Sequence, residues 1–212
     1  MKKYFAIGLA LAAIALMPTT IRAASGEPIV LFDGKTFAGW EGDQEVFRIE
    51  DGAIVGGSLK EKVPHNDFLC TTKEYGDFEL RVTFKLLGEN ANAGIQFRTK
   101  KIPNNFEVSG YQADMGQQYW GCLYDESRRN KVLAGPDKDA VAKVLKLNDW
   151  NEYVIRAEGS HIQLWLNGLK TVDYTETDAT VATTGIIAVQ IHGGPPSEAW
   201  YKDLRLVELG KK

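Results

Sequence analysis

The stretch Phe78-Glu-Leu-Arg-Val-Thr-Phe-Lys-Leu86 decides the fold, because apolar and polar side chains alternate along it without a break. Successive side chains of a β-strand point to opposite faces of the sheet. The apolar residues from Phe78 to Leu86 therefore face a core, and the charged and hydroxylated residues between them face water. A strand with one buried face and one solvent-exposed face is typical of an antiparallel sheet.

The rest of the chain is predicted to repeat this pattern in short strands. Asp51-Gly52 and Asn167-Gly168 each stand between alternating runs, and such dipeptides are among the stronger hairpin signals. The only helix we expect is a short one within residues 139–147, where apolar residues follow a helical period. About a dozen strands with closely spaced turns predict an all-β sandwich or jelly roll of two antiparallel sheets, in one domain over residues 24–212.

Charge and composition narrow the class of protein. The chain has 212 residues, a formal net charge of −3 and 44% hydrophobic residues, which are ordinary values for a globular protein. Because it lacks a basic excess, nucleic acid is not an expected partner.

The N-terminus has the organisation of a targeting segment. Lys2 and Lys3 precede the apolar run from Phe5 to Met17, and Ile21-Arg22-Ala23 offers a cleavage site after Ala23. Residues 1–23 are therefore predicted to be a signal peptide. The apolar run is short for a bilayer-spanning helix, so a retained membrane anchor is the less favoured alternative. We expect an exported protein, periplasmic or extracellular in a bacterium, with no membrane association after cleavage.

The two cysteines, Cys70 and Cys122, leave two alternatives open. Export permits a disulfide between them. A domain of this size can bury a sufficient core without one, so two small buried thiols are the other alternative.

Six polar residues occupy positions where an ordinary core strand carries apolar ones. Alternation places them in pairs on one face of each of three strands, near residues 94–99, 107–114 and 185–192. The six are Gln96, Arg98, Gln112, Asp114, Gln190 and His192. Burying such groups without partners is costly, so the face that carries them must be wet or occupied by a ligand.

The composition of this polar set points to a sugar. Amides hydrogen-bond neutral hydroxyls in both directions, and the set is rich in glutamine. Aromatic residues that can stack on a sugar ring follow nearby, at Tyr111, Tyr119, Trp120 and Tyr124. The plain alternative is the solvated outer face of an antiparallel sheet, and for Tyr111 core packing is an equal alternative.

The usual catalytic and cofactor motifs are missing from the sequence. It has no Gly-x-Ser-x-Gly elbow, His-Glu-x-x-His, phosphate-binding loop or Cys-x-x-Cys pair. His65 lies in a predicted loop, where a histidine is more often on the surface than a ligand, and His161 is expected to be exposed. We predict no cofactor and no metal site, although oxygen ligands alone could hold a structural Ca²⁺.

Seven motifs occur in an order that resembles the 3-keto-disaccharide hydrolase domain family, formerly a domain of unknown function. The likeness covers nearly all of residues 31–209. The motifs are Leu31-Phe-Asp-Gly-Lys35 with Gly39-Trp40, Tyr75-Gly-Asp-Phe-Glu-Leu80, Asn92-Ala-Gly-Ile-Gln-Phe-Arg98, Gly110-Tyr-Gln-Ala-Asp114, Trp150-Asn-Glu-Tyr153, Leu166-Asn-Gly168, and Gly185-Ile186 with Gln190 and His192. The chain departs from the common pattern at Ala93, where the family often has serine, and at Gln112-Ala113-Asp114, where the family often has Glu-x-Gln.

The resemblance implies a concanavalin-A-like jelly roll in an exported bacterial protein that acts on glycosides oxidised to a ketone at C3. A ketone at C3 acidifies the C2 hydrogen, so a base can remove it, the C1 substituent can leave, and water can add. This chemistry needs a general base and a group that stabilises the enolate oxygen. Asp114 or His192 is the candidate base, and Arg98, whose charge is permanent, is the candidate oxyanion partner.

The remaining candidates bind the substrate. Gln96, Gln112 and Gln190 are expected to hold sugar hydroxyls, and Tyr124 and His65 are expected on the side of the leaving group. A non-catalytic carbohydrate-binding module is the alternative, because the same fold and the same amide side chains are equally compatible with sugar binding alone. A structural domain of an envelope assembly is a third alternative, and it predicts an exposed apolar patch in place of a polar cleft.

Overall fold

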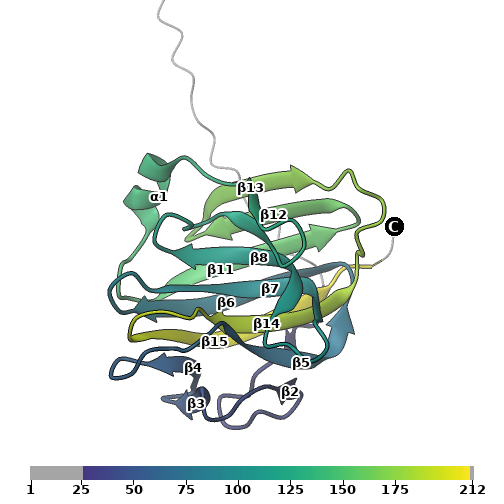
Figure 1. Ribbon diagram of the computed structural model, residues 1–212. Coiled ribbons are helices and arrows are strands. Elements are labelled where there is room, and N and C mark those ends of the chain that lie inside the picture. Colours follow the sequence, from purple (N-terminus) through teal and green to yellow (C-terminus); the bar gives the residue numbers. More distant parts are fainter. Residues whose placement is uncertain (1–25, 211–212) are drawn as a thin grey trace, which may run out of the picture.

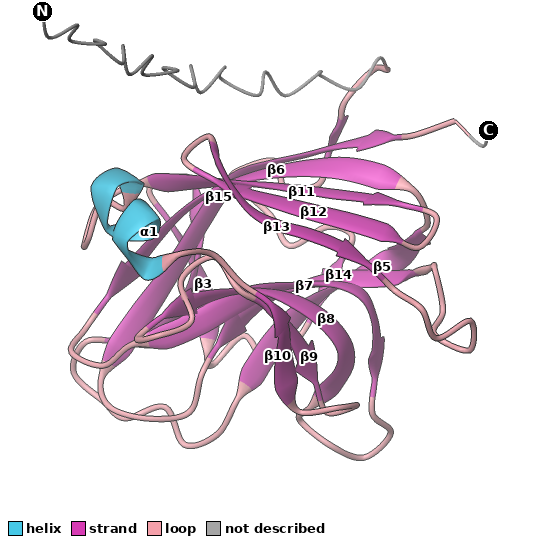
Figure 2. Cartoon of the chain, turned by 90° about the horizontal axis from the view of Figure 1, so that it is seen from above, coloured by secondary structure: helices cyan, strands magenta, loops and turns pink. Residues whose placement is uncertain are grey.

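The computed structural model describes residues 26–210 and forms two antiparallel sheets packed face to face (Figures 1 and 2). The predicted signal peptide, residues 1–23, lies outside the described residues. Among the residues that are described, no helix has the length and apolar character needed to cross a bilayer. The predicted all-β jelly-roll sandwich is confirmed.

The first sheet, sheet A, has eight strands. In spatial order these are β13 (Leu169–Thr175), β12 (His161–Leu166), β11 (Asn151–Glu158), β6 (Phe78–Leu87), β15 (Ser197–Glu208), β4 (Ala53–Ser58) and β3 (Phe47–Glu50), with β1 (Ile29–Val30) paired to β15. The stretch that opened the sequence analysis is therefore β6, a central strand of this sheet.

The second sheet, sheet B, has seven strands. In spatial order these are β10 (Lys131–Ala134), β9 (Leu123–Glu126), β8 (Val108–Gly116), β7 (Asn92–Lys101), β14 (Gly185–Ile191), β5 (Asp67–Tyr75) and β2 (Trp40–Glu41). The strands predicted to carry the polar set, β7, β8 and β14, are direct neighbours at its centre.

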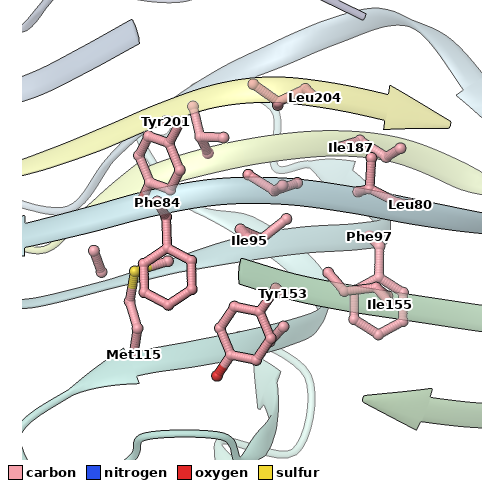
Figure 3. Packing of buried hydrophobic residues seen from close by; sticks show 14 of the residues in the cluster. Leu80, Phe84, Ile95, Phe97, Met115, Tyr153, Ile155, Ile187, Tyr201 and Leu204 are labelled. Atoms are coloured by element: carbon pink, nitrogen blue, oxygen red, sulfur yellow. The ribbon is translucent and has the colours of Figure 1, made fainter. Parts of the chain in front are cut away.

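The core lies between the sheets, where their inner faces interdigitate (Figure 3). Leu80 and Phe84 of β6 point from sheet A toward Ile95 and Phe97 of β7 in sheet B, and all four are fully buried. The outward side chains of β6 are more exposed, with the exception of Glu79. Two arginines cover Glu79, because Arg81 lies 3.0 Å and Arg156 3.3 Å from its carboxylate.

The expected helix is present as α1 (Lys138–Val144), at one end of the sandwich (Figure 2). Asp137 caps it by accepting a hydrogen bond from the backbone N–H of Ala140, and Leu145 ends it in an extended conformation. Val141 is its buried residue. The helix is thus a short closure over the sandwich.

Two tyrosines of sheet A reach across the core and hold the backbone of the strands that carry the polar set. The Tyr153 hydroxyl donates to the carbonyl of Asp114 at 2.5 Å and accepts from the backbone N–H of Gly121 at 2.8 Å. The Tyr201 hydroxyl donates to the carbonyl of Gln190 at 2.5 Å. Both side chains are fully buried, so these bonds fix β8 and β14 from behind.

Replacing Tyr153 by Phe is expected to lower the free energy of unfolding by about 1–3 kcal/mol, because the Asp114 carbonyl and the Gly121 N–H lose a buried partner. Urea unfolding measures the change. Tyr174→Phe removes a half-buried hydroxyl, 3.3 Å from Glu176, and is the control, with a smaller expected loss. Equal losses in the two variants would contradict a special role for the Tyr153 hydroxyl.

Candidate functional site

The outer face of sheet B carries most of the predicted polar set in adjacent rows. Gln96 of β7 pairs with Gln112 of β8, and Gly94 pairs with both Asp114 and Gln190. A Cβ atom on Gly94 would lie 2.2 Å from the Gln112 side chain. Glycine at this position therefore lets Gln112 lie across β7, between Gln96 and Asp114.

A cavity of about 280 Å³ opens on this face, beside β8 and β9. Four of the predicted site residues, Gln112, Asp114, Tyr124 and His192, are among those that line it. Its other lining residues are Asn92, Gln117, Tyr119 and Glu126. The cavity thus brings carboxyl, imidazole, amide and phenol groups from three strands and two loops to one place.

Asp114 is a buried carboxyl with no cation to neutralise it. It is 3% exposed, and among the described residues no lysine or arginine forms an ion pair with it. Burial is the main cause that raises the pKa of Asp114, to about 8, and repulsion by Glu126 adds to it. Hydrogen bonds from the Gln112 side chain, the Met115 backbone and the Asn92 side chain act in the opposite direction.

Asp125, on the adjacent strand β9, shows how a structural carboxylate is buried in this protein. It is fully buried, and the guanidinium groups of both Arg128 and Arg129 contact its carboxylate. Buried charges are ordinarily paired in this way. A buried carboxyl that is left unpaired on a cavity wall is therefore a candidate for proton transfer, as strongly perturbed carboxyls in clefts often are.

Glu126 is the second carboxyl of the cavity, and the sequence analysis missed it. Burial, followed by repulsion from Glu107, raises the pKa of Glu126 to about 7. Its position could have been inferred, because it lies two residues after Tyr124 and so faces the same side of β9. The cavity therefore holds two carboxyls that change charge near neutral pH.

A chain of amides orients the Asp114 carboxyl. The Gln96 side-chain N–H donates to Gln112 Oε1 at 2.7 Å, which leaves the Gln112 NH₂ group to donate to Asp114. Asn92 Nδ2 donates to Asp114 Oδ1 at 3.4 Å. Gln96 is fully buried and does not line the cavity, so it acts on Asp114 through Gln112 and is a positioning residue.

Replacing Gln96 by Leu is expected to raise the pKa of Asp114 further, because Gln112 loses the bond that directs its NH₂ group toward the carboxyl. We expect the midpoint of the pH–rate profile that reports ionisation of Asp114 to move upward. Gln190→Leu is the matched control, because it removes a buried amide from the same sheet face without touching Asp114. Equal profiles for the two variants would contradict the positioning role of Gln96.

Arg98 is not part of the cavity, and the expectation that it shares a face with Gln96 is wrong. The pairing of β7 with β8 shifts register between Phe97 and Lys100, and Arg98 has a φ of 47°. Such a bulge inserts an extra residue and interrupts the alternation of side chains. The Arg98 guanidinium instead lies at one end of the sandwich, where it is 2.7 Å from Asp77 and donates to the carbonyls of Gly76 and Gly159.

Two further candidates lie outside the cavity lining. Gln190 is fully buried, and neither atom of its amide has a hydrogen-bond partner among the described residues. His65 donates a hydrogen bond from Nδ1 to the carbonyl of Asn66 and stacks on Phe106. Of the aromatic set, Tyr119 and Tyr124 line the cavity, whereas Tyr111 and Trp120 pack in or against the core.

The structure also bears on the cysteines and on metal ions. Cys70 and Cys122 are free thiols, so of the two alternatives the unpaired one holds. Within residues 26–210, no group of three His, Cys, Asp or Glu side chains is arranged to hold a metal ion.

The fold defines the class of the domain as a jelly-roll β-sandwich, here with a polar cavity on the outer face of one sheet. More particularly, the chain belongs to the 3-keto-alpha-glucoside-1,2-lyase-like domain family, whose model matches residues 27–207. The resemblance drawn from seven motifs is thereby confirmed. No curated protein matches the chain in sequence.

Solved structures with the same fold are distant in sequence. A candidate glycosyl hydrolase from Parabacteroides distasonis is 20% identical, with a TM-score of 0.66 over 87% of this chain and 94% of its own. A carbohydrate-binding module from Bacillus subtilis is 14% identical, with a TM-score of 0.61 over 78% and 93%. A β-glucanase from Bacillus licheniformis is 10% identical, with a TM-score of 0.58 over 87% and 99%. At these identities the likeness establishes the fold alone.

Proposed function

We propose that this protein is an exported enzyme that cleaves 3-keto-glycosides by removing the C2 proton and eliminating the C1 substituent. Addition of water to the resulting double bond would complete a net hydrolysis. The observation that carries the proposal is the unpaired, buried Asp114 carboxyl on the wall of a cavity rich in amides and hydroxyls. Membership of the 3-keto-alpha-glucoside-1,2-lyase-like family supports this choice of reaction.

Asp114 is the proposed base. A carboxylate whose pKa is about 8 binds a proton far more strongly than an ordinary carboxylate, and a catalytic base works best when its pKa lies near the working pH. When Asp114 is ionised it takes the C2 proton, and the electron pair moves toward the C3 oxygen as the enolate forms. The amide N–H groups of Asn92 and Gln112, both on the cavity wall, are the proposed donors to that oxygen.

The leaving oxygen at C1 must then receive a proton. His192 and Glu126 line the cavity beside Asp114 and are the proposed donors of this proton at neutral pH. The pKa of Glu126, about 7, leaves about half of this carboxyl protonated at that pH. Tyr119 and Tyr124 add hydroxyls that can bind the sugar.

The test is to incubate the protein, without residues 1–23, with methyl 3-keto-α-D-glucopyranoside and, separately, with its unoxidised parent. Release of methanol from the ketone alone supports the proposal, because only the ketone acidifies C2. Cleavage of both compounds would point to ordinary glycoside hydrolysis. Binding of either without cleavage would favour the carbohydrate-binding module.

A further inference from the structure

A stacked aromatic pair stands on the surface outside the cavity. The rings of His65 and Phe106 have their centroids 3.9 Å apart at an interplanar angle of 23°. Phe106 is nevertheless 64% exposed, so His65 covers one face of its ring and the rest remains open to solvent. A solvent-exposed aromatic ring whose orientation is fixed by stacking offers a flat surface on which a ligand ring can stack.

The loops that carry this pair are hydrogen-bonded to each other and to the residue that follows the cavity-lining His192. The Asn66 side chain donates to Glu107 Oε1 at 3.0 Å and accepts from the backbone N–H of Gly193 at 3.0 Å. Gly193 follows His192, and Glu107 is close enough to Glu126 to raise its pKa. Asn66 and Glu107 therefore link the His192 side of the cavity to the Glu126 side, and His65 and Phe106 are their direct chain neighbours.

The size of the cavity requires part of a larger substrate to lie outside it. At about 280 Å³ it is near the lower limit of about 300 Å³ for small-molecule sites. One sugar ring is the unit such a space suits. The second ring of a disaccharide must then extend beyond the cavity, and Phe106 is the only aromatic side chain among the exposed large hydrophobic residues of the described part of the chain.

We propose that Phe106, held in place by His65, is the platform of a second sugar subsite, which takes the leaving ring of a disaccharide whose oxidised ring occupies the cavity. This inference rests on the proposed function. It assigns His65 the role of supporting Phe106 in place of binding the leaving group directly. It also predicts that the enzyme favours 3-keto-disaccharides over 3-keto-glycosides with small alkyl leaving groups.

The experiment compares 3-keto-trehalose with methyl 3-keto-α-D-glucopyranoside on the protein without residues 1–23. Phe106→Ala is expected to raise KM for 3-keto-trehalose about tenfold. This change corresponds to the loss of roughly 1.4 kcal/mol of stacking free energy. The constants for the methyl glycoside should stay unchanged. Phe106→Tyr keeps the ring and should behave as the wild type, and Val30→Ala, an exposed apolar residue on sheet A, is the control.

The outcomes separate this inference from the proposed function. If Phe106→Ala leaves both substrates unaffected, or weakens both equally, the subsite is wrong although the proposed reaction stands. If the wild type cleaves neither compound, calorimetry of 3-keto-trehalose binding tests the Phe106 platform independently of the reaction. Weaker binding in Phe106→Ala than in Phe106→Tyr supports the platform while the reaction fails, and equal binding or no binding overturns the platform as well.

Discussion

Replacing Asp114 by Asn is expected to lower kcat/KM for a 3-keto-glucoside by about 10²–10⁴, the usual contribution of a positioned base. The same substitution is expected to stabilise the fold at pH 8. Asn has nearly the shape of the carboxyl and never carries its charge, so the buried site no longer resists ionisation. A variant that is less active and more stable distinguishes a functional carboxyl from a structural one.

The raised pKa of Asp114 determines how the stabilisation by Asp114→Asn changes with pH. Burial raises the pKa of Asp114 from 3.8 to about 8 in the folded state. Between these values the folded wild type binds a proton that the unfolded chain lacks, so its stability decreases as pH rises, by at most about 1.4 kcal/mol per pH unit. The Asn variant does not have this loss, so its advantage should grow from pH 4 to pH 8.

Thermal unfolding at pH 5 and pH 8 measures the effect. Asp173→Asn is the control, because hydrogen bonds from Lys170 and His161 hold the pKa of this exposed carboxyl below its ordinary value. Its removal should give no stabilisation at either pH. Undiminished turnover by Asp114→Asn would remove Asp114 from the mechanism, and an advantage that shrinks with rising pH would contradict a raised pKa.

Replacing Asp77 by Ala is expected to destabilise the protein by about 3–5 kcal/mol, because it leaves the Arg98 guanidinium buried without its counter-charge. The Arg98 side chain is 2% exposed, and its contact with Asp77 is 2.7 Å long. In a chain of this length the loss corresponds to a decrease of about 10 °C in Tm. At temperatures where the variant is folded, its kcat/KM should match that of the wild type.

Two other variants complete this test. Glu50→Ala breaks an exposed pair with Arg48, and such pairs contribute about 1 kcal/mol or less. Arg98→Met removes the buried charge itself and should cost less than Asp77→Ala, since Asp77 is partly exposed and can be solvated. A loss of activity in Arg98→Met without a change in Tm would restore Arg98 as the oxyanion partner.

The alternation of apolar and polar residues predicted the strands well. It failed to predict the bulge at Arg98, and the predicted site was wrong there. The alternation in 78–86 and the dipeptides Asp51-Gly52 and Asn167-Gly168 gave β6 and two hairpins correctly. No residue type marks the bulge at Arg98, because arginine rarely adopts a positive φ. The strand β10 was not predicted, because its four residues, Lys-Val-Leu-Ala, are too few to show an alternation and lie within the polar, irregular stretch 125–139.

The sequence alone determined the sandwich, the family and the shared face of Gln112 and Asp114, because these follow from a period of two and from motifs contiguous in the chain. Tertiary structure decided which of the polar residues meet. Register, burial and the bulge separate Arg98 from Asp114, leave Gln96 and Gln190 buried outside the cavity lining, and place Glu126 in that lining. Burial also decides the chemistry, because a carboxyl becomes a base near pH 8 only where the folded chain removes both water and cations from around it.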